Sequence, residues 1–183
     1  AAYQKTYMAL RLPMSAGFQN IANVKDIPFI ARHASKTREQ VCKALSLPAN
    51  KPLVLVSFGG YGLSSLDTDA LAKTKKYTIV TTTNLPLGRR KDSGERKGSF
   101  ISLDEQSIYD AGVRYEDIVG AAEAVVTKPG YGIIAESIAN DTAVLYTSRG
   151  HFPEYDVLVQ EMPKYLRQAF ISHDELFAGR FLL

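Results

Sequence analysis

The chain has 183 residues, of which 45% are hydrophobic and 22% are charged, and its formal net charge is +3 at pH 7. These proportions are typical of one soluble globular domain, and they exclude disordered, fibrous and disulfide-rich proteins. The single cysteine, Cys42, cannot form an internal disulfide, and no apolar run reaches the roughly 18 residues of a membrane span. We therefore expect a cytoplasmic protein without a transmembrane segment.

The sequence alternates expected strands and helices along most of its length. In chain order we expect a helix that begins at the capping box Thr37–Gln40, a strand at 53–57, a helix at 63–76, strands at 77–83 and 99–103, a helix at 115–122, a strand at 123–128, a helix at 132–140, a strand at 143–148, and a helix at 154–167 that Pro163 bends or shortens. This alternation predicts an α/β fold, a Rossmann-like parallel sheet with helices on both faces. We assign residues 31–183 to this domain and residues 1–30 to a linker or edge segment.

The excess positive charge lies in one segment. Between Pro86 and Gly98, five basic residues from Arg89 to Lys97 stand against two acidic ones, a difference of +3 that equals the charge of the whole chain. The segment lacks apolar periodicity, so we expect a solvated loop, with a phosphate- or partner-contacting loop as the alternative. A nucleic-acid binder would instead spread basic residues over a face, and we therefore expect no nucleic-acid partner.

Two glycine-rich segments, Ser57–Gly62 and Thr127–Gly132, each follow an expected strand and precede an expected helix. Ligands of a parallel sheet bind at the carboxyl ends of its strands. Glycine lets the backbone approach a ligand, and the free N–H groups at a helix start attract anions. Because Lys128 adds a cation beside the second segment, we interpret the pair as a phosphate site, with two ordinary tight turns as the alternative.

Comparison with known phosphate-binding motifs excludes some classes of phosphate ligand and leaves others open. The P-loop pattern Gly-x-x-x-x-Gly-Lys-Ser/Thr is absent, so a P-loop nucleotide hydrolase is not expected. The segment 130–135 fits G-x-G-x-x-A, but it lies in a late βαβ unit and lacks an acidic ribose ligand about 20 residues further on. Arg149 could accept a 2′-phosphate there, which leaves an NADP-dependent dehydrogenase as an alternative.

Polar residues after the second glycine-rich segment suit a sugar. Glu136 lies one turn into the expected helix, where a carboxylate can accept two hydrogen bonds from a vicinal diol such as a ribose. The segment Arg149–Asp156 gathers a cation, an imidazole, aromatic rings and two carboxylates at the same edge. The alternatives are a helix-dipole partner for Glu136 and helix caps for Glu154 and Asp156. The three histidines lack ligand spacing, so we expect no metal site.

Several segments resemble one family of enzymes. The stretches 125–136, 143–148 and 149–156 are similar to the donor-binding half of GT-B glycosyltransferases, two-domain enzymes that use nucleotide-diphosphate sugars. The stretches 10–14, 26–32 and 55–62 resemble the glycosyltransferase-like proteins related to the N-terminal part of arabinokinase-type proteins. This resemblance covers the chain from about Leu10 to the end. It implies the C-terminal half of a GT-B fold, a nucleotide-sugar donor, no further cofactor, and a missing N-terminal domain that binds the acceptor.

The resemblance also implies roles for individual residues. The donor diphosphate would contact Gly59, Gly60, Lys128, Gly130, Tyr131 and Gly132; the ribose would contact Glu136; the donor sugar would contact Arg149, Phe152, Glu154 and Asp156; and Gly112 to Tyr115 would border the base. No catalytic residue is implied, because the general base of inverting members usually belongs to the N-terminal domain. The fragment alone is therefore expected to be inactive. A regulatory module that binds a sugar nucleotide and a sugar-nucleotide epimerase remain alternatives.

Overall fold

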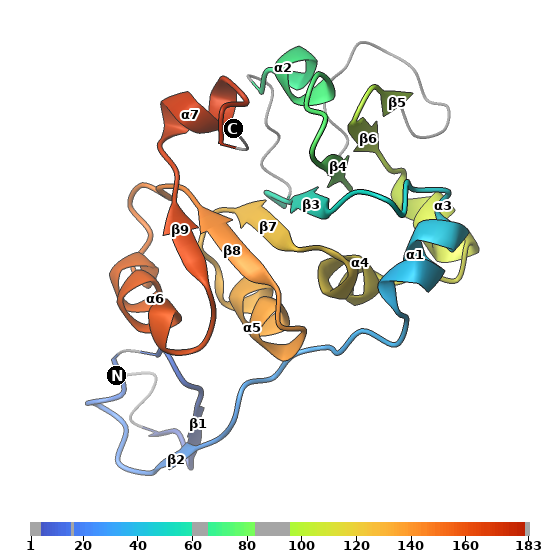
Figure 1. Ribbon diagram of the computed structural model, residues 1–183. Helices are drawn as coiled ribbons and strands as arrows, with labels where there is room; N and C mark the ends of the chain where they lie inside the picture. Colours follow the sequence, from blue (N-terminus) through green and yellow to red (C-terminus); the bar gives the residue numbers. More distant parts are fainter. Residues whose placement is uncertain (1–4, 16, 60–65, 83–95, 182–183) are drawn as a thin grey trace.

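The computed structural model describes residues 5–15, 17–59, 66–82 and 96–181. Its helices and strands form one α/β body and a separate N-terminal ribbon (Figure 1). In chain order they are β1 (Ala9–Arg11), β2 (Val24–Asp26), α1 (Arg38–Ala44), β3 (Leu53–Val56), α2 (Thr68–Ala72), β4 (Thr78–Thr81), β5 (Arg96–Lys97), β6 (Phe100–Ser102), α3 (Glu105–Asp110), α4 (Tyr115–Ala121), β7 (Ala124–Thr127), α5 (Tyr131–Ala139), β8 (Ala143–Tyr146), α6 (Tyr155–Glu161), the 3-10 turn η2 (Met162–Lys164), β9 (Gln168–Phe170) and α7 (His173–Phe177).

The central sheet has seven strands in the order β5-β6-β4-β3-β7-β8-β9. Every neighbouring pair is parallel except β5 and β6. Without the short β5, the chain order of the strands across the sheet is 3-2-1-4-5-6, which is the strand order of the Rossmann fold. The predicted Rossmann-like parallel sheet is thus confirmed.

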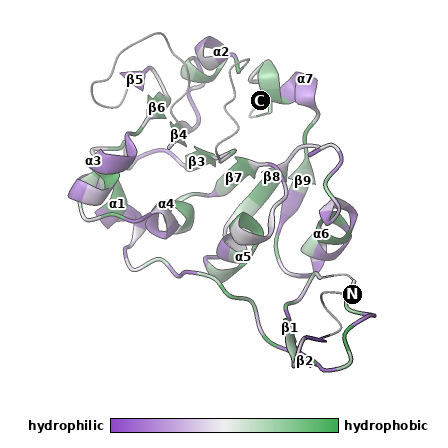
Figure 2. Cartoon of the chain, turned by 180° about the vertical axis from the view of Figure 1, so that it is seen from behind, coloured by the Kyte–Doolittle hydropathy of each residue, from purple (hydrophilic) through white to green (hydrophobic). Residues whose placement is uncertain are grey.

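Helices cover both faces of this sheet. Leu53 and Leu55 of β3 share a buried cluster with residues of α1, α3 and α4. Val54 and Val56 of the same strand share a second cluster with residues of α2 and α7. A strand buried on both sides needs apolar side chains at every position, which explains the continuous apolar run at 53–56. Figure 2 shows the central strands in the hydrophobic colour, as this burial requires.

Some elements differ from the prediction in length, and others were not predicted. The helix expected at 63–76 is described only as α2, Thr68–Ala72, because Asp67 caps its start and residues 63–65 lie outside the described part. The helix expected from 154 ends at Glu161, and Pro163 lies in the 3-10 turn that follows. Helices α3 and α7 and strand β9 were not predicted. They are only three to six residues long, which leaves little room for a periodic pattern.

The basic segment is described only at its end. Arg96 and Lys97 form β5, which pairs antiparallel with β6, so these two residues belong to a strand and not to the predicted loop. Arg96 donates hydrogen bonds to the carbonyl oxygens of Ser46 and Leu45, at 2.9 and 3.1 Å, and Lys97 pairs with Asp69. These side-chain contacts attach the strand to the end of α1 and to α2. The rest of the basic segment lies among the residues 83–95, outside the described part.

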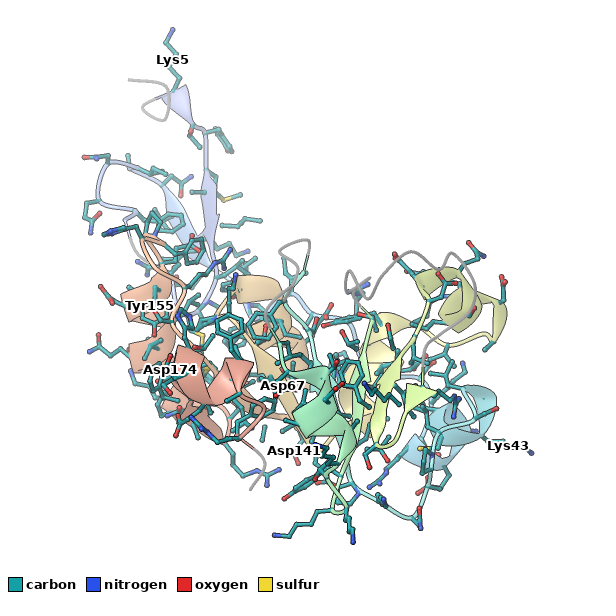
Figure 3. All side chains as sticks on the ribbon, turned by 90° about the horizontal axis from the view of Figure 1, so that it is seen from above. Lys5, Lys43, Asp67, Asp141, Tyr155 and Asp174 are labelled. Atoms are coloured by element: carbon teal, nitrogen blue, oxygen red, sulfur yellow. The ribbon has the colours of Figure 1, made fainter. Side chains whose placement is uncertain are left out.

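The N-terminal ribbon is a separate two-stranded parallel sheet of β1 and β2. In Figure 3 it projects from the body, and Lys5 lies far from Lys43 and Asp67. Met14 and Phe29, which follow β1 and β2, pack in a cluster with residues of α5 and α6 and attach the ribbon to the body. The boundary at residue 30 between this segment and the domain stays a prediction.

Candidate functional site

The candidate site lies where the chain order of the strands reverses. After β3 the chain passes to β4 on one side, whereas β7 pairs with the other side of β3. The connections that leave β3 and β7 therefore diverge and open a crevice at the carboxyl edge of the sheet. A cavity of about 820 Å³ occupies this position. Its walls are formed by Arg32, Ser57, Phe58, Gly59, Thr82, Glu105, Ile108, Tyr109, Tyr115, Thr127, Lys128, Gly130, Gly132, Ile133, Glu136 and Arg149.

The N-terminus of α5 opens onto this cavity. Gly130 is the N-cap residue, and a glycine has no side chain that could cap the helix. Gly130, Gly132 and Ile133 all line the cavity. The first N–H groups of a helix have no intrahelical partner and carry a partial positive charge. On the β3 side, Gly59 has a φ of +63°, a left-handed conformation that glycine adopts without strain. The two glycine-rich segments therefore meet at one cavity through the residues that are described.

Arg149 is fixed beside this helix start. Its Nη1 donates a hydrogen bond of 2.7 Å to the carbonyl oxygen of Pro129, and its guanidinium lies 3.6 Å from the centre of the Phe152 ring. A Cβ atom at Gly130 would lie 3.0 Å from the same Nη1. Glycine at this position thus allows the cation to pack closely against the backbone that enters α5.

The cavity is electropositive on balance. Among the described residues, three cations line it, Arg32, Lys128 and Arg149, against the carboxylates of Glu105 and Glu136. The Nζ of Lys128 lies 5.8 Å from the centre of the Phe58 ring. Together with the dipole of α5, this excess of positive charge favours an anionic ligand.

Glu136 is buried and paired. Only 8% of the residue is exposed, and its Oε1 accepts bonds from Nε and Nη2 of Arg32 at 2.6 and 2.5 Å. Nη1 of Arg32 lies 3.3 Å from Oε2 of Glu116. The bond to Glu136 raises the pKa of Arg32 above its ordinary value. The ion pair thus joins a buried carboxylate to an arginine whose side chain is 58% exposed.

A tyrosine and a serine form a hydrogen bond beside the cavity. The hydroxyl of Tyr115, on α4, lies 2.7 Å from Oγ of Ser57, which follows β3. Burial raises the pKa of Tyr115, and the hydrogen bond to Ser57 opposes that shift only in part. The phenol is therefore uncharged at neutral pH and can contact a flat ring or donate a hydrogen bond. Tyr115 is also the residue of the expected base-bordering stretch 112–115 that lines the cavity.

The structure brings together part of the predicted site. Gly59, Lys128, Gly130, Gly132, Glu136 and Arg149 all line the cavity. Tyr131 is not among the lining residues; its ring packs with Phe29 at a centroid distance of 6.0 Å, and its buried hydroxyl has no hydrogen-bond partner among the described residues. The predicted contact of its backbone N–H group with the diphosphate stays a prediction. Gly60 lies outside the described residues.

Of the residues predicted to meet the donor sugar, Arg149 lines the cavity, whereas Phe152, Glu154 and Asp156 are not among its lining residues. Phe152 supports the guanidinium of Arg149. Glu154 is the N-cap residue of α6, yet no side-chain hydrogen bond caps that helix, and Asp156 lies in its first turn. Both carboxylates are exposed. No side-chain hydrogen bond thus supports the alternative role of Glu154 as a helix cap. The sugar-binding role of this segment stays a prediction.

Sequence reasoning did not identify Arg32 and Glu116 as site residues. Arg32 lies in the stretch 26–32 that carries part of the family resemblance, which is the one signal that could have indicated it. Within the described parts of the chain, no group of three His, Cys, Asp or Glu residues could hold a metal ion. None of the described helices is both long and apolar enough to cross a bilayer.

The fold is that of glycosyltransferases. A glycotransferase of kitacinnamycin superposes with a TM-score of 0.54 at 16% identity, over 93% of this chain and 44% of that chain. The glycosyltransferase SnogD from Streptomyces nogalater superposes with a TM-score of 0.50 at 13% identity, over 93% of this chain and 49% of that chain. The chain thus has a glycosyltransferase-like α/β fold and spans less than half of these enzymes.

Sequence comparison points to a particular relative. The chain is 23% identical to L-arabinokinase of Arabidopsis thaliana over 185 residues, which covers 98% of this chain and 16% of that protein. No known protein-family profile matches the sequence. The expected resemblance to glycosyltransferase-like proteins, with a link to arabinokinases, is thus confirmed at the level of the fold and of one distant relative.

Proposed function

We propose that this chain is the donor-binding domain of a GT-B glycosyltransferase. It holds a nucleotide-diphosphate sugar while the glycosyl group passes to an acceptor on another domain. The observation that carries this proposal is the cavity at the strand-order reversal, where the uncapped start of α5 lies beside Lys128 and Arg149. Its volume of about 820 Å³ is within the range of small-molecule and cofactor sites.

In this proposal each group of residues contacts a different part of the nucleotide-sugar. The N–H groups at the start of α5, with Lys128 and Arg149, face the diphosphate and stabilise the negative charge that grows on it as the glycosyl bond breaks. Glu136 accepts hydrogen bonds from the ribose, and Tyr115 borders the base. Phe152, Glu154 and Asp156, which follow Arg149 along the chain, contact the donor sugar.

The acceptor and the general base belong to a second domain in this proposal. The chain spans less than half of the glycosyltransferases that share its fold, which is consistent with such a domain. The helix dipole and the two cations supply the charge stabilisation that a metal ion supplies elsewhere, so the proposal needs no metal.

A panel of ligands tests the proposal directly. Thermal shift and calorimetry are measured with UDP-sugars, GDP-sugars, the four nucleoside diphosphates, uridine and NADPH. We expect stabilisation by at least one nucleoside diphosphate and its sugar, and none by the nucleoside alone, because the site is built around the diphosphate. Binding of NADPH alone would favour the dehydrogenase, and no response to any diphosphate would overturn the proposal. Nucleotide-sugar binding without transfer by the full-length protein would favour the regulatory module.

Replacing Glu136 tests the ribose contact. Glu136→Ala is expected to weaken the best nucleotide-sugar of the panel by about 10- to 100-fold, the effect of hydrogen bonds to a charged group. Glu161→Ala is the matched control, because Glu161 is also a helical carboxylate paired with a cation, Lys164, and does not line the cavity. Unchanged affinity in calorimetry, with the fold intact by circular dichroism, would make Glu136 a structural residue only.

A further inference from the structure

The contact between Arg32 and Glu136 is one-sided. Nε of Arg32 donates a hydrogen bond of 2.6 Å to the carboxylate oxygen Oε1, and Nη2 forms an ion pair with the same oxygen at 2.5 Å. Among the described residues, no side chain or backbone group donates a hydrogen bond to the other oxygen, Oε2, of this cavity-lining residue. The guanidinium therefore fixes the plane of the carboxylate and leaves lone pairs of Oε2 for a ligand.

Arg32 is itself held in place from two helices. Its carbonyl oxygen accepts a bond of 3.0 Å from Nδ2 of Asn140, and the same Nδ2 bonds the carbonyl oxygen of Glu136 at 2.7 Å. On the other side, Nη1 of Arg32 lies 3.3 Å from Glu116 of α4, whose side chain is mostly buried. Hydrogen bonds of both the main chain and the side chain thus fix the position of Arg32 relative to Glu136, although 104 positions in the sequence separate the two residues.

We propose that Arg32 is a positioning residue that sets Glu136 to read the ribose hydroxyls, and that it makes this site prefer ribonucleoside diphosphates over their 2′-deoxy counterparts. The inference rests on the proposed function. An unpositioned carboxylate could rotate to satisfy a single hydroxyl, whereas a carboxylate fixed at one oxygen meets a vicinal diol in one orientation. A site built for two hydroxyls leaves a lone pair unsatisfied when one hydroxyl is missing, and it rejects the deoxy ligand for that reason.

The affinity ratio between paired ligands tests this inference. ADP, GDP, CDP and UDP are each compared with the 2′-deoxy form by calorimetry, in the native chain and in Arg32→Gln. For the ribonucleotide that binds best, the native chain should favour the ribo form by about 10-fold or more, as expected for one hydrogen bond to a charged group. Arg32→Gln should bring this ratio below about 3, and Arg32→Lys should give an intermediate ratio because a single ammonium cannot form the fork.

The controls separate positioning from charge and from folding. Arg38→Gln removes another arginine that pairs with a glutamate, Glu123 at 3.2 Å, on a surface that does not line the cavity, and its ratio should equal that of the native chain. An equal loss for both forms in Arg32→Gln, with the ratio unchanged, would overturn the inference and make Arg32 a plain cation for the diphosphate. A native ratio near 1 would overturn it as well. Absence of any diphosphate binding by the native chain would instead overturn the proposed function.

Discussion

Asp117→Asn is expected to lower the free energy of unfolding by about 3 kcal/mol, the largest stability effect of any single carboxylate in the described parts of the chain. Asp117 is fully buried, and its carboxylate accepts bonds from N–H of Ser35 (2.7 Å), Lys36 (3.1 Å) and Arg114 (2.9 Å), and from the hydroxyl of Ser35 (3.1 Å). An asparagine has the same shape, but its NH₂ would face one of these donors. The melting temperature should fall by roughly 10 °C for a chain of this size.

Asp110→Asn is the matched control for this change. Asp110 is exposed on α3 and accepts one bond, of 2.8 Å, from Gln106. Its replacement should change the free energy of unfolding by less than about 0.5 kcal/mol. If urea denaturation gives Asp117→Asn the same small effect, the carboxylate of Asp117 does not stabilise the attachment of residues 35–36, which precede α1, to helix α4.

The same carboxylate predicts a dependence on pH. Burial alone would raise the pKa of Asp117, but the bonds from the N–H groups of Arg114, Ser35 and Lys36 outweigh it and lower the pKa below the ordinary value of 3.8. A carboxyl with a depressed pKa stabilises the fold above its ordinary value, and this contribution is lost as the pH falls through the folded pKa. The stability difference between the native chain and Asp117→Asn should therefore be constant near neutrality and shrink below about pH 4. A difference that stays constant down to pH 2 would contradict this account.

Most of the fold could be predicted from the sequence, because the patterns that indicate its strands and helices lie within each element. The run Leu53–Val56 is apolar at every position since both sheet faces are covered, and the capping box at Thr37 is present as predicted. The glycine-rich segment before α5 also indicated its own position at the carboxyl edge. Short elements such as β9, with three residues, carry no such pattern and were missed.

The candidate site could be predicted from the sequence only in part, because its charged side chains pair with residues that are distant in the sequence. Glu136 could be assigned to the site because it follows the glycine-rich segment by only a few residues. Nothing in the local sequence, however, indicates that the side chain of Arg32 contacts Glu136. Two charges can pair at any separation along the chain, and only the packed structure selects the partner. The positions of Glu154 and Asp156 outside the cavity wall likewise depend on where α6 begins, which sequence patterns fix only to within a few residues.

Removing the guanidinium of Arg149 should have the largest effect on ligand binding. Arg149→Ala is expected to weaken nucleoside diphosphate binding by about 100-fold, because a hydrogen-bonded cation at an anionic ligand contributes about 3 kcal/mol. Arg149→Lys should recover only part of the affinity. Lysine keeps the charge, but it loses the stacked guanidinium on Phe152 that sets the direction of the bond to the Pro129 carbonyl.

Three comparisons make the Arg149 result specific to the diphosphate. Lys128→Ala should also weaken the diphosphate ligand, whereas Arg167→Ala, which removes an exposed arginine outside the cavity wall, should not. Raising the salt concentration should weaken binding in the native chain more than in Arg149→Ala, since one charge contact is already absent. A salt dependence that is the same in Arg149→Ala and in the native chain, despite the lower affinity, would show that Arg149 acts by holding the Pro129–Gly130 backbone. In that case the positive charge that the proposed glycosyl transfer needs would come from Lys128 and the start of α5.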